Sequence, residues 1–354
     1  MKIQGKSYHS IWLGEDKKAV YIIDQRFLPF KLVINTLRSM DEIFAAIRDM
    51  QVRGAPLIGV AAAYAMYFAL LENRNPVYAA EKLKTARPTA INLFYAVDRV
   101  MAKIFRVINQ KEQIKLALEE AEKIMQEELD NCRMIGKNGL SLLKEISKKK
   151  KGEPVHVLTH CNAGWLACVD YGTATAPIYA AHNNGIALHV WVDETRPRNQ
   201  GARLTAFELG QEGVPHTVIA DNTGGYLMQQ GMVDIVIVGC DHMTKEGDVV
   251  NKIGTYLKAL AAKDNNIPFY VALPQSTIEE KRRGKSKDVV IEERQAEEVS
   301  HIEGWDGNEL KRLQLIPEGS PVANYGFDIT PARLITGIIT EKGVFNSVEN
   351  MSKK

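Results

Sequence analysis

Cys161 and Asp241 are the two residues whose places in the sequence most favour chemistry. Cys161 comes just after the apolar run 155-VHVLT-159, and Asp241 just after the apolar run 234-DIVIVG-239. A thiol beside the start of a helix has a lowered pKa and supplies a reactive thiolate. A carboxyl group in apolar surroundings has a raised pKa and can donate a proton near neutral pH. These residue types predict proton transfer at the ends of two strands.

Each of the two residues also has a simpler interpretation. Cys161 is equally consistent with a small buried thiol that does no chemistry. Asp241 is consistent with a cap on the following loop or with a metal ligand, but the sequence around it shows no carboxylate and histidine cluster with metal-ligand spacing. His160 and His242 flank the pair, and each is more typical of a hydrogen-bonded histidine at a strand end than of a ligand. Both interpretations stay open on these residues alone.

Basic residues beside predicted helix starts favour a phosphate group, because backbone amides and guanidinium groups recognise one. The candidates lie in four places along the chain: Arg53 with Gly54, Ala55 and Pro56; Arg87 with Pro88 and Thr89; the segment 193–209 with Arg196, Arg198, Asn199, Gln200 and Arg203; and Asn251 with Lys252. Neither glycine-rich nucleotide-binding motif is present in the sequence. A phosphorylated small molecule is therefore favoured over a nucleotide.

Short apolar runs that alternate with helical patterns must position these residues. The runs are VHVLTH, 186-IALHVWVDE-194, 216-HTVIAD-221, 234-DIVIVGCD-241 and 268-PFYVALP-274. Continuously apolar strands separated by helices imply parallel βαβ units with both sheet faces covered. In such sheets ligands bind at the carboxyl ends of the strands. We therefore expect the polar residues that end these strands to converge on one edge: His160, Cys161, Asp193, Glu194, Asp221, Asn222, Cys240, Asp241 and His242.

The first half of the chain has a different pattern. Strand-like runs at 10–13, 19–24 and 30–35 predict a small antiparallel sheet, and helical patterns cover 41–50, the run after Pro56, 91–105 and 111–146. The predicted fold class is α/β, with a mainly helical N-terminal domain carrying a small antiparallel sheet, followed by a Rossmann-like domain with a mostly parallel sheet. We place the domains at 1–130 and 131–354, with the boundary inside the long helical stretch.

Composition limits the classes of partner. The chain has 354 residues, of which 45% are hydrophobic and 25% charged, and 45 Lys and Arg against 43 Asp and Glu give a formal net charge of +2. That balance does not support a nucleic acid as partner. The apolar run 55–71 is expected to form a buried helix and no membrane span, and the N-terminus lacks the apolar core of a signal peptide. The spacing of the four cysteines favours reduced thiols in a cytoplasmic protein.

Seven segments of the chain resemble the methylthioribose-1-phosphate isomerase family. They are VRGAPLIG (52–59), RPTAINL (87–93), THCNAGWLA (159–167), VWVDETRPRNQGARLTAFEL (190–209), ADNTGGYLM (220–228), VDIVIVGCDHMTKEGDVVNKIGTYLKA (233–259) and NYGFDITPARLITGIITEKGVF (324–345). The resemblance covers nearly the whole chain. The wider superfamily includes ribose-1,5-bisphosphate isomerases and regulatory subunits of the guanine-nucleotide exchange factor for translation initiation, which share the sheet domain.

The resemblance implies a cofactor-independent aldose–ketose isomerase that converts 5-methylthioribose 1-phosphate to 5-methylthioribulose 1-phosphate in methionine salvage. It places the catalytic cysteine on Cys161 and the catalytic aspartate on Asp241, with no metal, and it suggests a homodimer. The substrate-binding positions that it implies are Arg53, Gly54, Ala55, Arg87, Gln200, Asn251 and Lys252.

Two alternatives belong to the same superfamily. A ribose-1,5-bisphosphate isomerase would need a second cationic pocket for the 5-phosphate in place of an apolar one, and the segment VRGAPLIG favours the methylthio substrate. A non-catalytic regulatory subunit would have no reason to keep both Cys161 and Asp241 in these settings.

Overall fold

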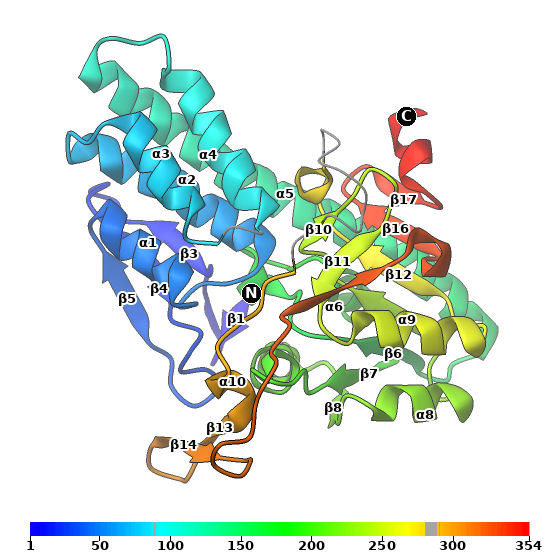
Figure 1. Cartoon of the computed structure of the whole chain (residues 1–354). Helices are drawn as coiled ribbons and strands as arrows, with labels where there is room; N and C mark the ends of the chain where they lie inside the picture. Colours follow the sequence, from blue (N-terminus) through cyan, green and yellow to red (C-terminus); the bar gives the residue numbers. More distant parts are fainter. Residues whose placement is uncertain (88–89, 280–288, 290, 354) are drawn as a thin grey trace.

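The computed structural model describes residues 1–87, 90–279, 289 and 291–353, and within them the chain forms two parts that share one long helix. In Figure 1 the first part, coloured blue to cyan, lies beside the second part, coloured green to red. The predicted fold class, a helical part with a small antiparallel sheet followed by a mostly parallel sheet, is confirmed.

Helices dominate the first part. Its elements are β1 (Lys2–Ile3), β2 (Lys6–Ser7), β3 (Ile11–Leu13), β4 (Val20–Ile23), β5 (Ile34–Leu37), α1 (Met40–Arg48), α2 (Ala55–Leu71), α3 (Pro76–Lys84) and α4 (Ile91–Ile104). The strand predicted at 30–35 begins only at Ile34, because Phe30 and Lys31 donate backbone hydrogen bonds to Phe27 in a turn. Helix α3 was not predicted, although its Asn75 cap followed by Pro76 is a start signal.

Helix α2 is the core of this part. It is apolar on every side, and every residue from Ala55 to Leu70 is buried, as expected of a helix surrounded by protein. Its neighbours are α1, α3, α4 and the long helix α5. Among the described residues, none of the helices combines the length and the apolarity that crossing a bilayer requires.

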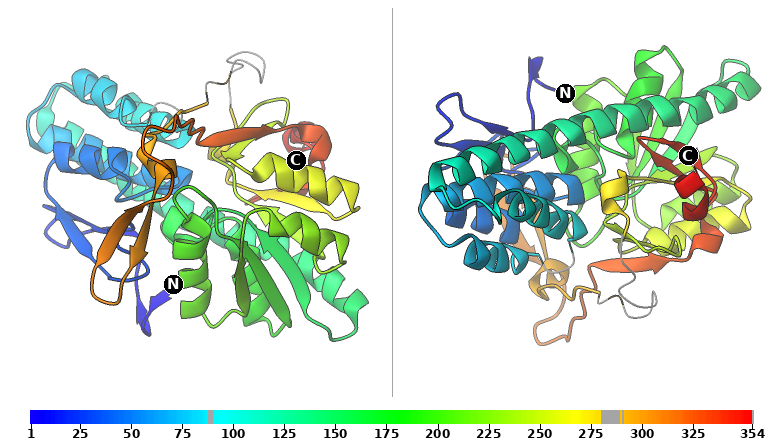
Figure 2. Two further views of the ribbon diagram at one scale, coloured as in Figure 1. Left: turned by 60° about the horizontal axis from the view of Figure 1, so that its bottom comes forward. Right: turned by 90° about the horizontal axis from the view of Figure 1, so that it is seen from above.

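Helix α5 (Gln110–Lys150) runs along both parts (Figure 2). The side chain of Asn109 caps its start, and Lys151 ends it in the left-handed conformation. One end packs on α2 and α4 and the other on α6 (Thr175–Asn183), where Gly139 allows a close approach: a Cβ there would lie 2.5 Å from Pro177 Cγ. The domain boundary that we place near residue 130 falls inside this unbroken helix and stays a prediction.

A seven-stranded sheet forms the second part, in the order β17-β16-β12-β9-β6-β7-β8. The strands are β6 (Val155–Thr159), β7 (Leu188–Asp193), β8 (His216–Ile219), β9 (Ile235–Val238), β12 (Phe269–Ala272), β16 (Gly337–Thr340) and β17 (Gly343–Phe345). Every neighbouring pair is parallel except β16 with β17. Five of the parallel strands coincide with the five apolar runs. The sixth, β16, was not predicted.

Both faces of this sheet are covered, which explains why its strands are apolar throughout. Val157 and Ile235 face a core shared with α5 and α6. Their neighbours Leu158 and Val236 face the opposite core, shared with α8 (Thr223–Gln229) and α9 (Thr255–Asp264). Because adjacent strand residues point to opposite faces, burial on both sides requires apolar residues at every position.

A second, three-stranded sheet is an addition that the sequence analysis missed. It consists of β10 (His242–Met243), β11 (Val249–Lys252) and β15 (Phe327–Thr330). The prediction that a helix directly follows 234-DIVIVGCD-241 is wrong, because β10 and β11 come before α9. A turn closed by Thr244 and Asp248, with Gly247 at φ 88°, produces the hairpin.

A protruding hairpin connects the second part back to the first. After η3 (Gln275–Thr277), the chain forms α10 (Glu297–Ser300), β13 (His301–Trp305) and β14 (Leu310–Gln314), coloured orange in Figure 1. Trp305 of β13 stacks on Phe30, with ring centroids 5.5 Å apart. The hairpin therefore spans from the sheet to the helical part. The remaining elements are α7 (Ala206–Gln211) and the short helices η1 (Trp165–Ala167), η2 (Gly201–Thr205), η5 (Ala332–Leu334) and η6 (Val348–Lys353).

Glu128 of α5 is buried where the helix meets η3. Its Oε1 accepts a hydrogen bond from Ser276 Oγ at 3.3 Å, and no hydrogen-bond partner of Oε2 is found in the part of the chain that the structure describes. Burial is the main reason that its pKa is raised from 4.5 to about 7. Between these two pH values the folded state holds a proton that the unfolded chain releases, so the free energy of unfolding falls as the pH rises.

Glu128→Gln is expected to remove this part of the pH dependence. The variant should match the wild type below pH 4.5 and exceed its free energy of unfolding above pH 7, by up to roughly 3 kcal/mol. Denaturant unfolding at pH 4.5 and pH 8 measures the difference. Glu119→Gln, an exposed position on the same helix, is the control and should change little at either pH. An equal effect of Glu128→Gln at both pH values would contradict the expectation.

Candidate active site

The candidate site lies where the strand order reverses. Strand β6 pairs with β7 on one side and with β9 on the other, so the chain leaves β6 in one direction and returns on its opposite flank. Such a switch point leaves a crevice at the carboxyl ends of the two strands, where open α/β sheets bind ligands. Cys161 follows β6 and Asp241 follows β9. The two residues therefore stand on either side of the crevice.

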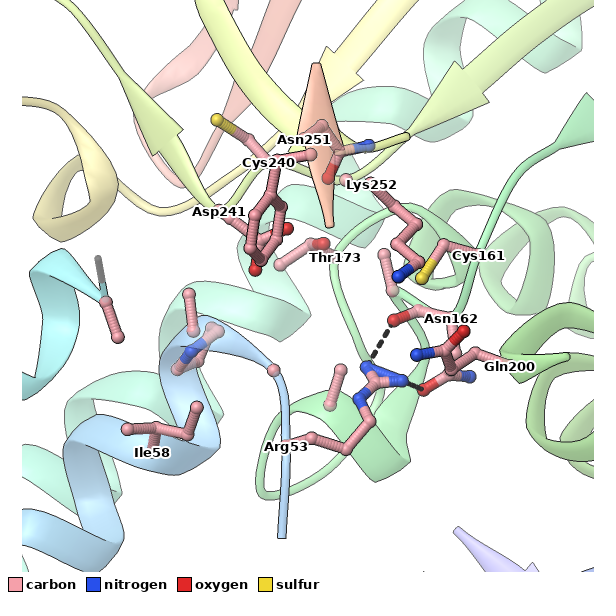
Figure 3. Close-up of a pocket in the computed structure, with 18 of the residues that line it drawn as sticks. Arg53, Ile58, Cys161, Asn162, Thr173, Gln200, Cys240, Asp241, Asn251 and Lys252 are labelled. Atoms are coloured by element: carbon pink, nitrogen blue, oxygen red, sulfur yellow. Dashed lines mark hydrogen bonds between the residues drawn. The ribbon is translucent and has the colours of Figure 1, made fainter. Parts of the chain in front are cut away.

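One cavity of about 890 Å³, partly open to solvent, occupies this crevice. The phosphate candidates Arg196, Asn199 and Arg203 do not line it, but all the site residues that the resemblance implies do: Arg53, Gly54, Ala55, Arg87, Cys161, Gln200, Asp241, Asn251 and Lys252. Figure 3 shows Asp241 across the pocket from Cys161, with Lys252 beside the Cys161 sulfur. The helical part supplies Arg53 to Ala55 and Arg87, so both parts of the molecule form the walls.

Two hydrogen bonds hold the Arg53 side chain just before the start of α2. Its Nη1 donates to Asn162 Oδ1 at 2.8 Å, and its Nη2 donates to the main-chain oxygen of Asn162 at 2.5 Å (Figure 3). Gly54 has φ 99°, and a Cβ there would lie 2.4 Å from the carbonyl oxygen of Ala167. Glycine is therefore required for the α2 start to approach η1 so closely.

Glu208 anchors the loop that holds Arg53. Its carboxylate accepts hydrogen bonds from Asn162 Nδ2 at 3.0 Å, from the main-chain amides of Trp165 and Leu166, and from Tyr179 Oη. The side chain is fully buried, and burial raises its pKa to about 7. Glu208 lies in the resemblance segment but was not predicted, because its role depends on a loop that is distant in sequence.

Cys161 does not stand at a helix start, and the expected lowering of its pKa is wrong. Helix α6 begins only at Thr175, and residues 160–164 form an irregular loop. Burial raises the pKa of the thiol above its usual value, while the positive charges of Arg53 and Lys252 oppose that shift. Burial thus favours the neutral thiol, and the two cations favour the thiolate.

Asp241 meets the expectation of a carboxyl group in a dry setting. Burial raises its pKa, and Arg53, Arg87 and Lys252 oppose that shift. Its backbone amide is bonded to Val250 of the neighbouring strand, 3.1 Å away, which fixes the residue at the end of β9. The carboxyl group is available as a proton donor over a wider pH range than an exposed aspartate.

Two predicted residues that line the cavity contain buried hydrogen-bonding atoms for which the described residues supply no partner. Arg87 and Gln200 are both buried, and among the described residues neither Arg87 Nε and Nη1 nor Gln200 Oε1 has a hydrogen-bond partner. Burying such groups without partners is costly. Their arrangement therefore suits a polar ligand, and Lys252 and Asn251 reach the same cavity from β11.

Arg294 and Arg198 also line the cavity, but carboxylates pair with both. Glu298 accepts from Arg198 Nη1 and from Arg294 Nη2, each at 2.8 Å, and Glu292 accepts from Arg294 Nη1 at 2.6 Å. The sequence analysis named Arg198 as a phosphate candidate. It missed Arg294, which belongs to none of the motifs and has no local signal.

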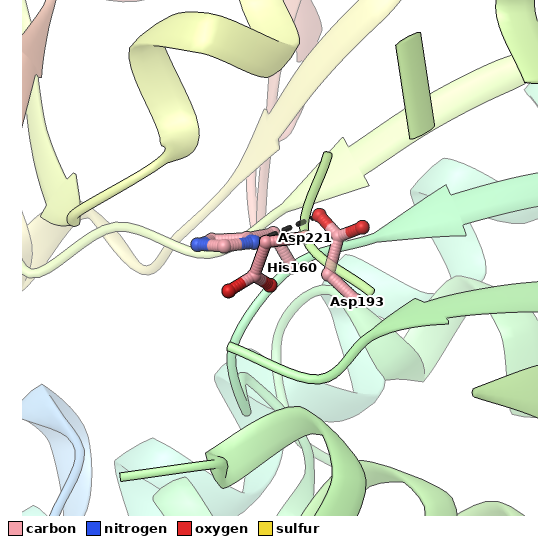
Figure 4. A group of neighbouring side chains, drawn as sticks. All are labelled: His160, Asp193 and Asp221. Carbon is pink, nitrogen blue, oxygen red and sulfur yellow. Dashed lines mark hydrogen bonds and ion pairs between the residues drawn. The ribbon is translucent and has the colours of Figure 1, made fainter. Parts of the chain in front are cut away.

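The other polar strand ends form a separate buried group. His160, Asp193 and Asp221 bring their ligand-type atoms within 4.8 Å of one another (Figure 4). Their donor types would suit a metal, but Lys258 Nζ already lies 3.3 Å from Asp193 Oδ2 and donates to the main-chain oxygen of Asp221. His160 bonds Asp193 through Nδ1 and the carbonyl of Ile253 through Nε2, both at 2.8 Å. We interpret the group as an internal ion network behind Cys161.

We expected the polar residues at the strand ends to converge on one edge of the sheet, but only some of them face the cavity. Cys161, Cys240 and Asp241 face the cavity, and His160 touches it from the ion network. Asp193 and Asp221 belong to the network and do not line the cavity. His242 points elsewhere, with Nε2 3.7 Å from Glu279.

Comparison with known proteins places the chain among close relatives. Residues 51–347 match the Initiation factor 2 subunit family. The methylthioribose-1-phosphate isomerase of Desulfosudis oleivorans is 57% identical over 343 residues, covering 94% of this chain and 93% of that protein. The methylthioribose-1-phosphate isomerase of Sinorhizobium medicae is 55% identical over 350 residues, covering 97% and 96%.

Solved structures show the same fold. The 5-methylthioribose 1-phosphate isomerase of Pyrococcus horikoshii has a TM-score of 0.83 and 36% identity, covering 98% of this chain and 96% of that chain. The delta subunit of translation initiation factor eIF-2B from A. fulgidus has a TM-score of 0.80 and 39% identity, covering 98% and 100%. Two neighbours with different names thus share one architecture.

Proposed function

Because this chain belongs to the Initiation factor 2 subunit family, we infer from its relatives and its pocket that it is a methylthioribose-1-phosphate isomerase. It is an aldose–ketose isomerase that acts on a sugar phosphate, 5-methylthioribose 1-phosphate, in methionine salvage. The regulatory-subunit alternative is not favoured, since the relatives that share more than half of their residues with this chain are isomerases.

The observation that carries the proposed mechanism is that Cys161 and Asp241 share one cavity, which both cationic and apolar side chains line. Arg53, Arg87 and Lys252 supply the positive charge. Met50, Ile58, Ala90 and Phe327 supply the apolar surface. A sugar phosphate that also carries an apolar methylthio group suits a lining of both kinds.

The phosphate would bind at the start of α2. We propose that the backbone amides of Gly54 and Ala55 and the side chain of Arg53 hold it, because a helix start and a guanidinium both favour an anion. Arg87, with two unused nitrogens in the described part of the chain, would supply further hydrogen bonds. Gln200, Asn251 and Lys252 would bind the sugar hydroxyls and fix its orientation.

Ring opening is the first chemical problem, because the anomeric oxygen is esterified to phosphate and the usual hemiacetal route is closed. Asp241 is our choice of acid. Its raised pKa keeps a proton available, which it would give to the ring oxygen as the bond between that oxygen and C1 breaks. The resulting positive charge at C1 would lie near the substrate phosphate.

Hydrogen must then move from C2 to C1. Two routes fit: removal of the C2 proton by a base, or direct hydride shift while a base takes the proton of the C2 hydroxyl. The first route needs Cys161 as thiolate, but burial keeps its pKa raised. The second route can use the Asp241 carboxylate left by ring opening as the base. We therefore favour the hydride shift, with Cys161 supporting the charged intermediate.

Turnover of defined sugar phosphates tests the function directly. The protein should convert 5-methylthioribose 1-phosphate with a much higher kcat/KM than ribose 1,5-bisphosphate, because contact with the apolar lining side chains suits a methylthio group and would leave a second phosphate unpaired. Product formation is followed by NMR. Preference for the bisphosphate would support the second isomerase, and turnover of neither would support a non-catalytic role.

We further propose that the protein forms a homodimer in the cytoplasm. Strand β8 is an edge of the sheet, and α8 and α9, which pack against each other, expose Tyr226 at 60% and Leu257 at 57%. An unpaired edge and exposed apolar side chains are each typical of a contact surface, and we propose a second copy of the chain as the partner. Free cysteines support the reducing compartment. Light scattering should give twice the mass of 39.5 kDa; a monomer at micromolar concentration would contradict the dimer.

Replacing either member of the proposed catalytic pair is expected to stop the chemistry without unfolding the protein. Cys161→Ser and Asp241→Asn should each lower kcat by roughly 100- to 10,000-fold, the range expected when a group that stabilises transition-state charge or a proton-transfer group is lost. Steady-state kinetics measures the loss, and circular dichroism confirms folding. Asp264→Asn, on the exposed end of α9, should leave kcat unchanged. A variant of the pair with near-wild-type kcat would remove that residue from the mechanism.

Turnover in deuterium oxide separates the two routes for hydrogen. A hydride shift carries the original hydrogen from C2 to C1, so the product formed in deuterium oxide should hold essentially no deuterium at C1. NMR or mass spectrometry of the product reads the label. Product incubated with the enzyme under the same conditions corrects for later exchange. Substantial deuterium at C1 beyond that correction would refute the hydride shift.

A further inference from the structure

Two residues beside the pocket have an unusual backbone conformation. Cys161 has φ 64° and Thr195 has φ 66°. Positive φ is uncommon for any residue except glycine, and for a β-branched residue such as threonine it is a clear outlier. Each such residue costs about 1–3 kcal/mol and persists only where its surroundings hold it. The two residues are in direct contact, because the backbone amide of Cys161 donates to Thr195 Oγ1 at 2.8 Å.

The hydroxyl of Thr195 is itself held in place. It donates its proton to the main-chain oxygen of Asp193 at 3.0 Å, which leaves its lone pairs for the Cys161 amide. The Asp221 carboxylate accepts from the backbone amide of Thr195 at 2.7 Å and from that of Arg196 at 2.8 Å. This explains how Thr195 keeps its strained conformation.

The ion network holds these two aspartates in turn. Asp193 is paired with His160 at 2.8 Å and with Lys258 at 3.3 Å, and all three side chains are buried. Lys258 also bonds the main chain of Asp221. The group that resembles a metal site therefore has a structural role. It fixes the ends of β7 and β8, where Asp193 and Asp221 hold Thr195 by hydrogen bonds.

A second threonine holds the other side of Cys161. Thr205 Oγ1 donates to the main-chain oxygen of Cys161 at 2.7 Å. Thr195 and Thr205 are both fully buried. Both polar main-chain atoms of Cys161 are thus bonded by threonine hydroxyls, while its sulfur is left pointing into the cavity beside Lys252 (Figure 3).

We propose that Thr195, assisted by Thr205, is a positioning residue that holds Cys161 in the left-handed conformation and so aims its sulfur at the reacting carbons. The part of this inference that concerns turnover rests on the proposed isomerase function. Without the Thr195 hydroxyl, the Cys161 amide loses its partner in a buried site, and the strained backbone is free to relax. The sulfur then moves away from the place between Arg53 and Lys252.

Thr195→Ala and Thr195→Ser are the informative pair, since they differ by one oxygen atom and neither is β-branched. Thr195→Ala should lower kcat roughly 10- to 100-fold, as expected when a reacting group is misplaced by about 1 Å. Its KM should change little, because the residues around the phosphate stay in place. Thr195→Ser keeps the acceptor and should restore kcat to nearly the wild-type value.

Alkylation of Cys161 by iodoacetamide, read at that residue by mass spectrometry, supplies a measurement that does not depend on turnover. In Thr195→Ala the sulfur leaves the two cations that oppose the raised pKa of the thiol. The pH profile of alkylation should therefore shift to higher pH than in the wild type. Thr195→Ser should retain the wild-type profile.

Thr340 is the matched control. It is fully buried in β16, its hydroxyl donates to the main-chain oxygen of Gly343 and accepts from the amide of Lys342, and it does not line the cavity. Thr340→Ala and Thr340→Ser should leave both kcat and the alkylation profile unchanged. Melting curves establish folding for every variant. If Thr195→Ala does not fold, Thr205→Ala and Thr205→Ser carry the same comparison.

Two results would overturn the inference. One is a folded Thr195→Ala with wild-type kcat and alkylation profile, and the other is a Thr195→Ser that is as impaired as Thr195→Ala. Failure of the proposed function has a different signature: the wild type itself does not turn over 5-methylthioribose 1-phosphate. In that case the alkylation profiles alone still decide whether Thr195 positions Cys161.

Discussion

The contact between Arg53 and Asn162 joins the helical part of the molecule to the sheet part at the cavity. Both hydrogen bonds are buried and one partner is charged, so they are among the stronger contacts that a protein makes. Asn162 is in turn fixed by Glu208, which also holds the backbone of the loop after β6. One chain of hydrogen bonds thus sets the start of α2 against the end of β6, and the cavity exists because these two meet.

Burial of that junction away from water determines the pKa values of its titratable groups. Burial raises the pKa of Cys161 and of Asp241 and lowers that of Lys252, so each group is pushed toward its neutral form. The surrounding arginines and Lys252 limit these shifts for the two acids. The pocket therefore presents proton donors next to positive charge. That combination suits a substrate which arrives with a phosphate and needs a proton at its ring oxygen.

The two structural neighbours show why function has to be argued from the site. An isomerase and an initiation-factor subunit both superpose on this chain with TM-scores of at least 0.80. Fold similarity of this size cannot separate catalysis from a regulatory role. The proposal depends on a thiol, a carboxyl group and unpaired polar atoms that share one cavity, and on relatives of higher identity.

The sequence by itself determined the strands of the parallel sheet and the candidate residues, and the tertiary structure decided how they are used. Continuous apolar strands are a local signal of burial on both faces, so the parallel sheet could be predicted, and Cys161 and Asp241 could be singled out at its strand ends. The reversal of strand order between β6 and β9 is not local, and it alone places these two residues across one crevice. Which residues at the strand ends reach the cavity is not local either: Asp193, the last residue of β7, belongs to the buried ion network, whereas Asp241, in the loop after β9, lines the cavity. The pKa of Cys161 was misjudged for the same reason: burial is a property of the packed molecule, and no pattern of neighbouring residues records it.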